Sequence, residues 1–312
     1  MSECIIRVDS LTKHFDGFQA LKGVSFELRR GEVCGFIGPN GAGKTTTMRI
    51  MATIDLPTAG EVWVNGHSVT QHPDNVRHCL GFMPDTYGDY DNLTCEEYLD
   101  FFARSYGYQA GDRVERVEAV VEFTGLGPIR GKLMTQLSKG MKQRLCLGRT
   151  LIHDPDVLVF DEPAAGLDPR ARAELRDLIK ELAARGKTVL ISSHILSELA
   201  DMCTDVAIIE RGVLKFKGPV GHAHGAVSAT ARYKLRVLEG ADKLEHFLLQ
   251  QAFVSRVASS GNDVTFHYDG DERNYCELLA AATAARFPIV ESRRLENNLE
   301  EAFLAMTTGE PE

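Results

Sequence analysis

Residues 38–45 read Gly-Pro-Asn-Gly-Ala-Gly-Lys-Thr, the G-x-x-x-x-G-K-[ST] spacing of a phosphate-binding loop. Glycine allows the tight backbone path that turns successive N–H groups toward a polyphosphate. Lys44 brings a mobile positive charge for the outer phosphates, and the Thr45 hydroxyl is a ligand for Mg²⁺. The pattern therefore predicts a site for a nucleotide with Mg²⁺, built from Gly38, Pro39, Asn40, Gly41, Ala42, Gly43, Lys44, Thr45 and Thr46.

A second constellation is the pair of acids Asp161 and Glu162, which follows the apolar run 157–160. An ordinary core strand would explain the apolar run, but not two carboxylates at its carboxyl end, where ligands bind in open α/β sheets. We expect Asp161 to hold Mg²⁺ through its water shell and Glu162 to orient or deprotonate an attacking water. The pair indicates hydrolysis rather than transfer of phosphate to a substrate hydroxyl.

A polar turn at residues 137–141, Leu-Ser-Lys-Gly-Met, leads into an expected helix over residues 141–151. On one interpretation, Ser138 is an ordinary helix N-cap. On the other, the N–H groups and helix dipole of this turn bind a γ-phosphate presented by another subunit, and Lys139, Gly140 and Met141 belong to the same site. The phosphate loop and the paired acids favour the second interpretation.

The sequence also predicts the elements that position the phosphate loop. Residues 32–37 form a mostly apolar run, which is typical of a buried parallel strand. Residues 46–54 contain no Gly or Pro, and Met48, Met51 and Ala52 fall on one helical face. Strand, glycine-rich loop and helix therefore follow one another in the order that phosphate binding requires.

Residues 86–150 are expected to form a mostly helical lobe. Thr94 and Glu97 have the spacing of a capping box at the start of one of its helices. The loop 85–91, rich in Gly, Asp and Tyr, is either a contact for a membrane partner or an ordinary solvated loop. Residues 151–218 should complete the α/β core, with a helix over 170–185 and a strand over 188–191.

Taken together, these blocks resemble the nucleotide-binding subunit of an ABC transporter over roughly residues 4–218. The resemblance implies an α/β P-loop NTPase of the ABC type, with a mixed sheet core and a helical lobe. It also assigns roles to the matching positions, namely adenine stacking by Phe15, Walker A at 38–45, the signature at 137–141, Walker B at 157–162, the D-loop at Asp168 and the γ-phosphate switch at His194.

Three of these positions have other interpretations. Phe15 taken alone fits a core aromatic better, and Asp168, which precedes Pro169, fits the start of a helix. A lone histidine is usually structural, but His194 stands at the end of the next strand after Walker B, which favours the functional role.

The sequence departs from the family pattern in two places. Asp85 follows Leu-Gly-Phe-Met-Pro where many relatives have a Gln that ligates Mg²⁺. Aspartate is also a hard oxygen ligand with a shorter arm, so we expect Asp85 to keep the metal role, through a water if needed. In the signature, Lys139 and Met141 replace the first Gly and the Gln, and Lys139 fits a solvated surface residue slightly better than a phosphate ligand. Both departures resemble the ATPases of ABC-2-type exporters.

Composition narrows the class of protein. The 312 residues suffice for two domains, and 44% hydrophobic with 25% charged residues is ordinary for a soluble protein. A net charge of −9 argues against a protein whose main task is to grip nucleic acid, so no direct nucleic-acid partner is expected. Seven Cys without a C-x-x-C pair indicate reduced thiols, and no signal peptide or run of ~18 apolar residues is visible.

The chain beyond the ATPase core divides into a linker and a small domain. Residues 1–218 are assigned to the ATPase domain and residues 219–231, rich in Gly, Ala and His, to a linker. Residues 232–312 show the order strand-helix-strand-strand-helix-strand, which predicts a small α+β accessory domain of the ferredoxin-like kind, followed by a final helix over 299–306. Its role is regulation, support of a dimer, or inert packing.

The function expected from the resemblance is MgATP hydrolysis by a head-to-tail dimer, either a homodimer or a pair with another ABC ATPase. That dimer would power an exporter through a separate transmembrane permease on the cytoplasmic face of the membrane. The main alternative is a soluble ABC ATPase acting on nucleic acid or ribosomes. It is disfavoured because no long coiled coil interrupts the core and only one core is present. A P-loop kinase or GTPase is disfavoured by the signature turn and His194, and a non-catalytic module by the intact Lys44, Asp161 and Glu162.

Overall fold

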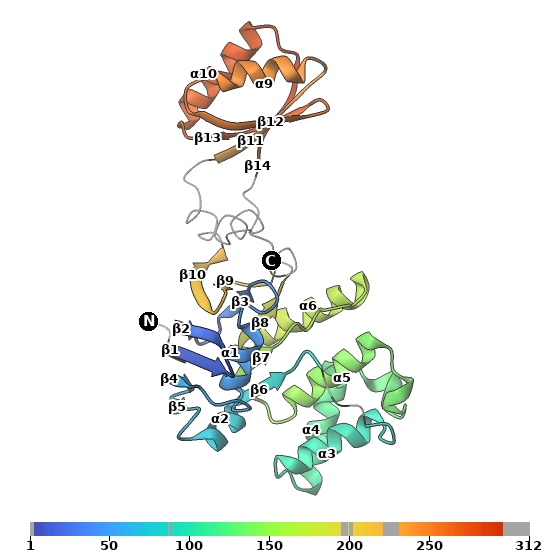
Figure 1. Ribbon diagram of the computed structural model, residues 1–312. Coiled ribbons are helices and arrows are strands. Elements are labelled where there is room, and N and C mark those ends of the chain that lie inside the picture. The colour runs from blue at the N-terminus through green and yellow to red at the C-terminus, as the bar shows by residue number, and fades with distance from the viewer. Residues whose placement is uncertain are drawn as a thin grey trace. The chain divides into compact units, whose positions relative to one another are not determined.

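The apolar run before the phosphate loop forms a central strand of a six-stranded sheet (Figure 1). All five residues of this strand, β3, are buried, and it pairs in parallel with β8 and β9. Only β10 runs antiparallel to its neighbour, so the sheet is mixed. In spatial order its strands are β10 (Val213–Pro219), β9 (Asp205–Glu210), β3 (Val33–Ile37), β8 (Thr188–Ser193), β7 (Val157–Phe160) and β6 (Leu80–Met83).

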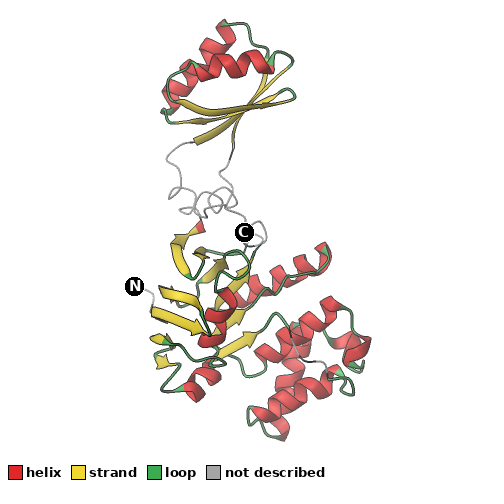
Figure 2. Ribbon diagram, viewed as in Figure 1, coloured by secondary structure: helices red, strands yellow, loops and turns green. Residues whose placement is uncertain are grey.

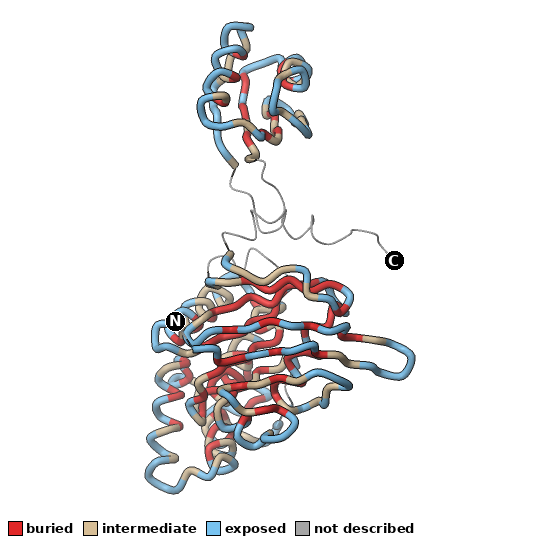
Figure 3. The backbone as a smooth tube through the Cα atoms, turned by 90° about the vertical axis from the view of Figure 1, so that its left-hand side faces the viewer, coloured by how far each residue is buried: buried red, intermediate tan, exposed pale blue. Residues whose placement is uncertain are grey.

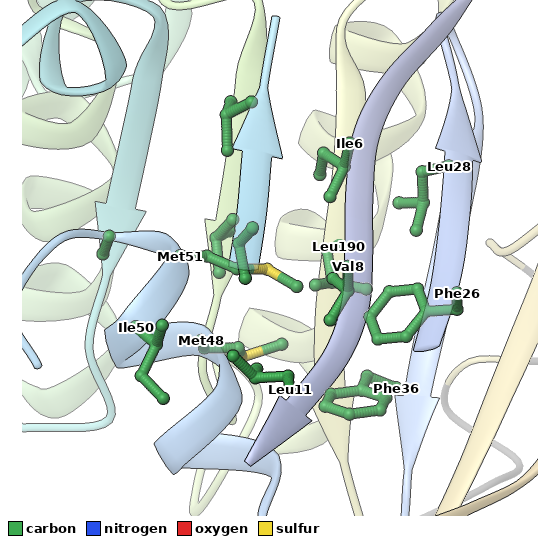
Figure 4. Close-up of a cluster of buried hydrophobic side chains, with 14 of the residues drawn as sticks. Ile6, Val8, Leu11, Phe26, Leu28, Phe36, Met48, Ile50, Met51 and Leu190 are labelled. Atoms are coloured by element: carbon green, nitrogen blue, oxygen red, sulfur yellow. The ribbon is translucent and has the colours of Figure 1, made fainter. Parts of the chain in front are cut away.

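A second, antiparallel sheet and helix α1 pack against one face of this sheet. Figure 4 shows their shared core, in which Val8 and Leu11 of the small sheet lie near Phe36 of β3 and Met48 of α1. Burial of such side chains removes apolar surface from water and fixes the strand that precedes the phosphate loop. The elements are β1 (Cys4–Phe15), β2 (Phe18–Arg29), β4 (Ala59–Val64), β5 (His67–Ser68) and α1 (Lys44–Met51).

A helical lobe is inserted between β6 and β7 (Figure 2). The expected capping box is present, because the Thr94 hydroxyl accepts from the Glu97 N–H while the Glu97 carboxylate accepts from the Thr94 N–H. Its elements are α3 (Cys95–Ser105), α4 (Ala110–Phe123), η1 (Gly127–Ile129), η2 (Met134–Gln136) and α5 (Lys139–Leu151). Two further helices, α2 (Pro73–Cys79) and α6 (Pro169–Ala184), belong to the core.

The computed structural model describes residues 3–86, 88, 90–194, 199, 202–220 and 231–295, and the chain divides into the units Met1–Val220 and Gly221–Glu312. Figure 3 shows that burial in the first unit follows the strands. Most of the expected linker 219–231 and the whole expected helix 299–306 lie outside the described residues.

The second unit contains the expected order of strands and helices around a core of its own. Its four strands are all antiparallel to their neighbours and lie in the order β12-β13-β11-β14, which is the ferredoxin-like arrangement. The elements are β11 (Ala231–Val237), α9 (Ala241–Leu249), β12 (Val254–Ser260), β13 (Asp263–Tyr268), α10 (Glu272–Ala284) and β14 (Ile289–Leu295).

Helix boundaries differ from the sequence expectation by a few residues. The helix after the phosphate loop spans Lys44–Met51 rather than 46–54, and α5 begins at Lys139 rather than at Met141. Both helices begin earlier because the chain turns helical directly after its cap, Gly43 in one case and Ser138 in the other. Within the described residues, no helix is both long and apolar enough to cross a membrane.

Candidate active site

The phosphate loop is held in a conformation that needs its glycines. Gly43 has φ 106°, in the left-handed region, and is the N-cap of α1. A Cβ added to Gly38 would collide with the backbone oxygen of Ile209, so β9 approaches the loop too closely for any side chain. Ala42 is fixed from the same side, because its carbonyl accepts from the Gly212 N–H at 3.0 Å. Asn40, Gly41 and Thr45 remain exposed, while Thr46 is half-buried at the start of α1.

Lys44 is buried, with 5% of its surface exposed, and its ammonium lies inside the loop. Lys44 Nζ donates to the carbonyl oxygens of Gly38 at 2.7 Å and Pro39 at 3.2 Å. It also lies 3.4 Å from Glu162 Oε1. The cation is therefore held between the phosphate loop and the acid that follows β7, which is the placement expected for a residue that serves both.

Glu162 joins three motifs that lie far apart in the sequence. Its Oε2 is 2.8 Å from Nδ1 of His194, and its Oε1 faces Lys44. Glu162 itself has φ 48°, an uncommon conformation for a residue with a side chain, and such strain persists only where the surroundings enforce it. Glu162 is largely buried and His194 is about half exposed, so a polar molecule can approach the pair from the histidine side.

Asp161 is almost completely buried beside Glu162. Its Oδ1 accepts from the Ser192 hydroxyl at 2.6 Å, whereas its Oδ2 has no hydrogen-bond partner among the described residues. Burial raises the pKa of the Asp161 carboxyl, the hydroxyls of Ser192 and Thr45 oppose this, and the charges of Asp85 and Glu162 add to the rise. A bound cation would instead lower the pKa of the Asp161 carboxyl. Asp161 Oδ2, which has no hydrogen-bond partner among the described residues, and the Thr45 hydroxyl therefore fit a hard metal ion that takes its other ligands from phosphate and water.

Ser192 is a residue whose importance the sequence reasoning missed. Its hydroxyl accepts from the Glu162 N–H at 2.8 Å and donates to Asp161 Oδ1, so one buried side chain on β8 holds both acids. Gln143 of α5 plays a related part, because its amide donates to the Pro163 carbonyl at 2.5 Å. The signal in the sequence was weak, because Ser192 is one of three hydroxyl residues in β8, with Thr188 and Ser193.

Asp85 lies at the end of β6 and is exposed. Its carboxylate accepts from the N–H and hydroxyl of Thr86, at 2.7 and 3.2 Å. It is close enough to Asp161 to raise the pKa of that carboxyl. Within the described residues no group of three or more His, Cys, Asp or Glu side chains forms a metal cluster.

The signature turn lies against the start of α6 rather than on the phosphate loop of its own chain. Ser138 is the N-cap of α5, and its hydroxyl accepts from the Met141 N–H at 3.3 Å. The end of the Lys139 side chain covers Gly166, so that a Cβ there would strike its ammonium. Gly140 approaches Ala171 closely enough that an added Cβ would lie 3.2 Å from the alanine methyl group. Ser138 and Lys139 are exposed at the start of α5, and Gly140 and Met141 are half-buried.

Asp168 and Phe15 can be compared with their alternative interpretations. Asp168 caps α6, because its carboxylate accepts from the Ala171 N–H at 2.9 Å. Phe15 is 48% exposed at the end of β1, with the Lys13 ammonium 5.0 Å from its ring centroid. Its exposure excludes the core role that its sequence pattern favoured when taken alone, and leaves the ring available for stacking.

Comparisons with known proteins agree with this geometry. The family model described as ABC transporter matches residues 21–165. The Nod factor export ATP-binding protein I of Ralstonia nicotianae is 33% identical, with 98% of this chain and 94% of that protein aligned. The daunorubicin/doxorubicin resistance ATP-binding protein DrrA of Streptomyces peucetius is 31% identical over 98% of this chain and 93% of that protein.

Solved structures give the same result for the first unit. An ATP-binding subunit of an ABC transporter superposes with a TM-score of 0.65 and 30% identity, covering 71% of this chain and 92% of that one. A dimeric bacterial ABC transporter cassette superposes with a TM-score of 0.64 and 26% identity, covering 69% of this chain and 99% of that one.

Proposed function

Because this chain belongs to the ABC transporter family of ATP-binding proteins and is an ATP-hydrolysing subunit, we propose that it drives export through a separate membrane permease. The observation that carries the hydrolytic part of this proposal is the constellation of Lys44, Glu162 and His194, in which one carboxylate faces both the phosphate loop and the switch histidine. The export direction is inferred from relatives. Three relatives that align over nearly their whole length are named for Nod factor export, daunorubicin/doxorubicin resistance and linearmycin resistance.

In the proposed reaction, Lys44 and the loop N–H groups bind the ATP phosphates. Glu162 orients the attacking water and accepts its proton, while His194 positions the γ-phosphate and holds the carboxylate. Thr45, Asp161 and Asp85 are the residues that would hold Mg²⁺, which supplies positive charge against the phosphates when bound. Phe15 would stack on the adenine ring.

The signature turn acts in trans in this proposal. Ser138, Lys139, Gly140 and Met141 are exposed or half-buried at the start of α5, and their described contacts are with α5 and the start of α6. A γ-phosphate held by a second subunit would meet the helix dipole and the free N–H groups at this end of α5. ATP would then bind the closed head-to-tail dimer better than the separate subunits and shift the population toward it.

Substitution of the proposed base tests the chemistry. Glu162→Gln keeps the shape of the side chain and removes the proton acceptor, so it should slow hydrolysis by about 10²- to 10⁴-fold while ATP still binds. The variant should also accumulate as an ATP-dependent dimer in size-exclusion chromatography with light scattering. Turnover close to that of the parent chain would remove Glu162 from the role of base.

The transport claim is tested separately by affinity purification from detergent-solubilised membranes, with mass spectrometry of the co-purifying proteins. A stoichiometric polytopic membrane protein is the expected result, and it would place the chain on the cytoplasmic face through that partner. Recovery only with ribosomes, DNA-binding proteins or no partner at all would leave the ATPase chemistry intact and exclude the transport role.

A further inference from the structure

The sheet of the second unit has one covered face. Helices α9 and α10 lie on the same side of it, as Figure 1 shows. The alternation along β11 and β13 agrees, because Tyr233, Leu235, Val237, Val264, Phe266 and Tyr268 are buried in the core of this unit. The residues between them point to the opposite face, which no described element of the unit covers.

This outer face gathers positive charge across neighbouring strands. Arg232, Lys234 and Arg236 alternate with the buried residues of β11. The register places Arg293 of β14 directly opposite Lys234, and His267 of β13 directly opposite Arg232. Side chains directly opposite on one face lie close together, so the like charges of Lys234 and Arg293 repel each other there.

Arg256 extends the same cluster. It lies at the irregularity in β12 between Ser255 and Ala258, with φ 48°, and it is exposed. Burial lowers the pKa of His267, and the positive charges of Arg256 and Arg232 lower it further. Arg256 therefore stands close enough to act on the same patch of sheet. We call Arg232, Lys234, Arg236, Arg256 and Arg293 the basic face.

Three carboxylates lie on or beside this face, two of them at one end of it. Asp263 pairs with Lys234 at 2.7 Å and with Arg236 at 3.5 Å, and Glu291 is directly opposite Arg236. Asp269 follows β13 on the same side as His267, and its charge raises the pKa of that histidine. Five cations thus stand against three acids, an excess of two positive charges among the described residues of the face. The chain as a whole carries −9, so composition alone does not explain this concentration.

The helical side of the unit has the opposite balance. Its acids are Asp242, Glu245, Asp271, Glu272 and Glu277, and its cations are Lys243, Arg273 and Arg294, the last of which is directly opposite the buried Tyr233. The charges of the unit are therefore sorted by face, basic on the open sheet and acidic on the helices. Such sorting orients a domain toward an extended negative surface.

We propose that the basic face binds the anionic headgroups of membrane phospholipids. The proposal rests on the proposed function, which brings the chain to a membrane through its permease. The face is a run of short and cationic side chains, with Ser255 and Thr265 between the cations, and this composition suits contact with a charged plane.

A nucleic acid fits less well. Binding of single strands relies on aromatic side chains that stack on bases. The aromatic residues of β11 and β13, Tyr233, Phe266 and Tyr268, all pack into the core instead. The charges of this face are therefore suited to headgroups rather than to stacked bases.

The test is co-sedimentation of the full chain with vesicles of phosphatidylcholine, with and without phosphatidylglycerol. Binding should require phosphatidylglycerol and weaken with salt. Each cation near an anionic surface strengthens binding to it. The double variant Arg256→Glu with Arg293→Glu should therefore weaken partitioning of the chain onto the phosphatidylglycerol vesicles by at least about 30-fold. Neither arginine has an ion pair among the described residues, so the reversal removes no ion pair within that part of the chain.

The matched control is Lys243→Glu with Arg273→Glu, which changes the net charge equally but on the helical side. It should bind vesicles nearly as well as the parent chain. If the double reversal fails to fold by circular dichroism, Arg293→Gln alone should still weaken binding by about 5-fold.

Three results would overturn the proposal. The first is that the full chain does not bind the vesicles. The second is that both double variants lose binding equally. The third is that the chain binds single-stranded RNA or poly-glutamate more tightly than phosphatidylglycerol. Co-purification with a permease does not depend on any of these results, so failure here is distinguishable from failure of the proposed function.

Discussion

Removal of one hydroxyl, in Ser192→Ala, should slow ATP hydrolysis although none of the residues proposed to contact ATP or Mg²⁺ is replaced. The Ser192 hydroxyl accepts from the Glu162 N–H at 2.8 Å and donates to Asp161 Oδ1 at 2.6 Å, in a position with no solvent exposure. Each buried polar group left without a partner costs about 1–3 kcal/mol, so the two together should lower the free energy of unfolding by roughly 2–6 kcal/mol.

The effect on catalysis follows from the strained backbone of Glu162. Its φ of 48° is held partly by the bond to Ser192, and a relaxed backbone would move the carboxylate. A displacement of about 1 Å at a reacting group costs on the order of 10²-fold in rate, so kcat should fall by about that factor while the KM for ATP changes little.

Steady-state ATPase kinetics and thermal unfolding measure the two effects. Ser192→Thr is the control, because it keeps the hydroxyl at a position that lines a cavity of ≈ 200 Å³ with Ile191 and Leu175. It should retain most of the activity. Full activity in Ser192→Ala, or equal loss in both variants, would show that the hydroxyl does not position Glu162.

Three further predictions follow from other parts of the chain. Burial lowers the pKa of His153 to about 4 from its ordinary 6.5. The neutral histidine therefore contributes stability that is fully present above pH 6.5 and is lost as the pH falls toward 4, and the free energy of unfolding should fall by about 3 kcal/mol over this range. Urea unfolding on either side of pH 6.5 should show a smaller loss for His153→Gln, and an equal loss would contradict the assignment. Asp85→Asn should raise the Mg²⁺ concentration needed for half-maximal hydrolysis, and an unchanged Mg²⁺ dependence would exclude Asp85 as a metal ligand. Leu235→Ala, at a fully buried position of the second unit, should cost about 2–5 kcal/mol and shift only one of two calorimetric transitions, whereas a shift of both would show that the units unfold together.

The chemistry-bearing segments were predictable because each is written in a few consecutive residues. The loop before Lys44, the acids after β7 and the capping box at Thr94 depend on local backbone geometry, and the structure has all three where the sequence predicts them. The parallel strands around β3 were predictable as buried runs. Their order in the sheet was not, because apolar runs carry no information about which strand pairs with which.

The contacts that hold the site were not predictable for the same reason. Ser192 lies 30 positions from Glu162 along the chain, and the Lys139 side chain reaches Gly166 only because α5 and the start of α6 meet. The basic face depends on register, since a slip of one residue in β11 would turn Arg232, Lys234 and Arg236 into the core. Sequence periodicity shows that buried and exposed side chains alternate along a strand. Only the strand pairing shows which charged side chains of other strands lie on the same face.

The position of β3 in the sheet has a consequence for how the chain is made. Both of its neighbours, β8 and β9, come much later in the sequence, and the Gly31 N–H that precedes β3 bonds to the Thr188 hydroxyl 157 positions further on. At about 5–20 residues per second, a ribosome needs roughly 8–30 s to supply those neighbours. During that interval the five residues of β3, all buried in the folded chain, have no partner strand, so the segment exposes unpaired backbone groups and apolar side chains that favour aggregation. A fragment that ends before residue 205 lacks β9 and leaves one edge of the phosphate-loop strand unpaired.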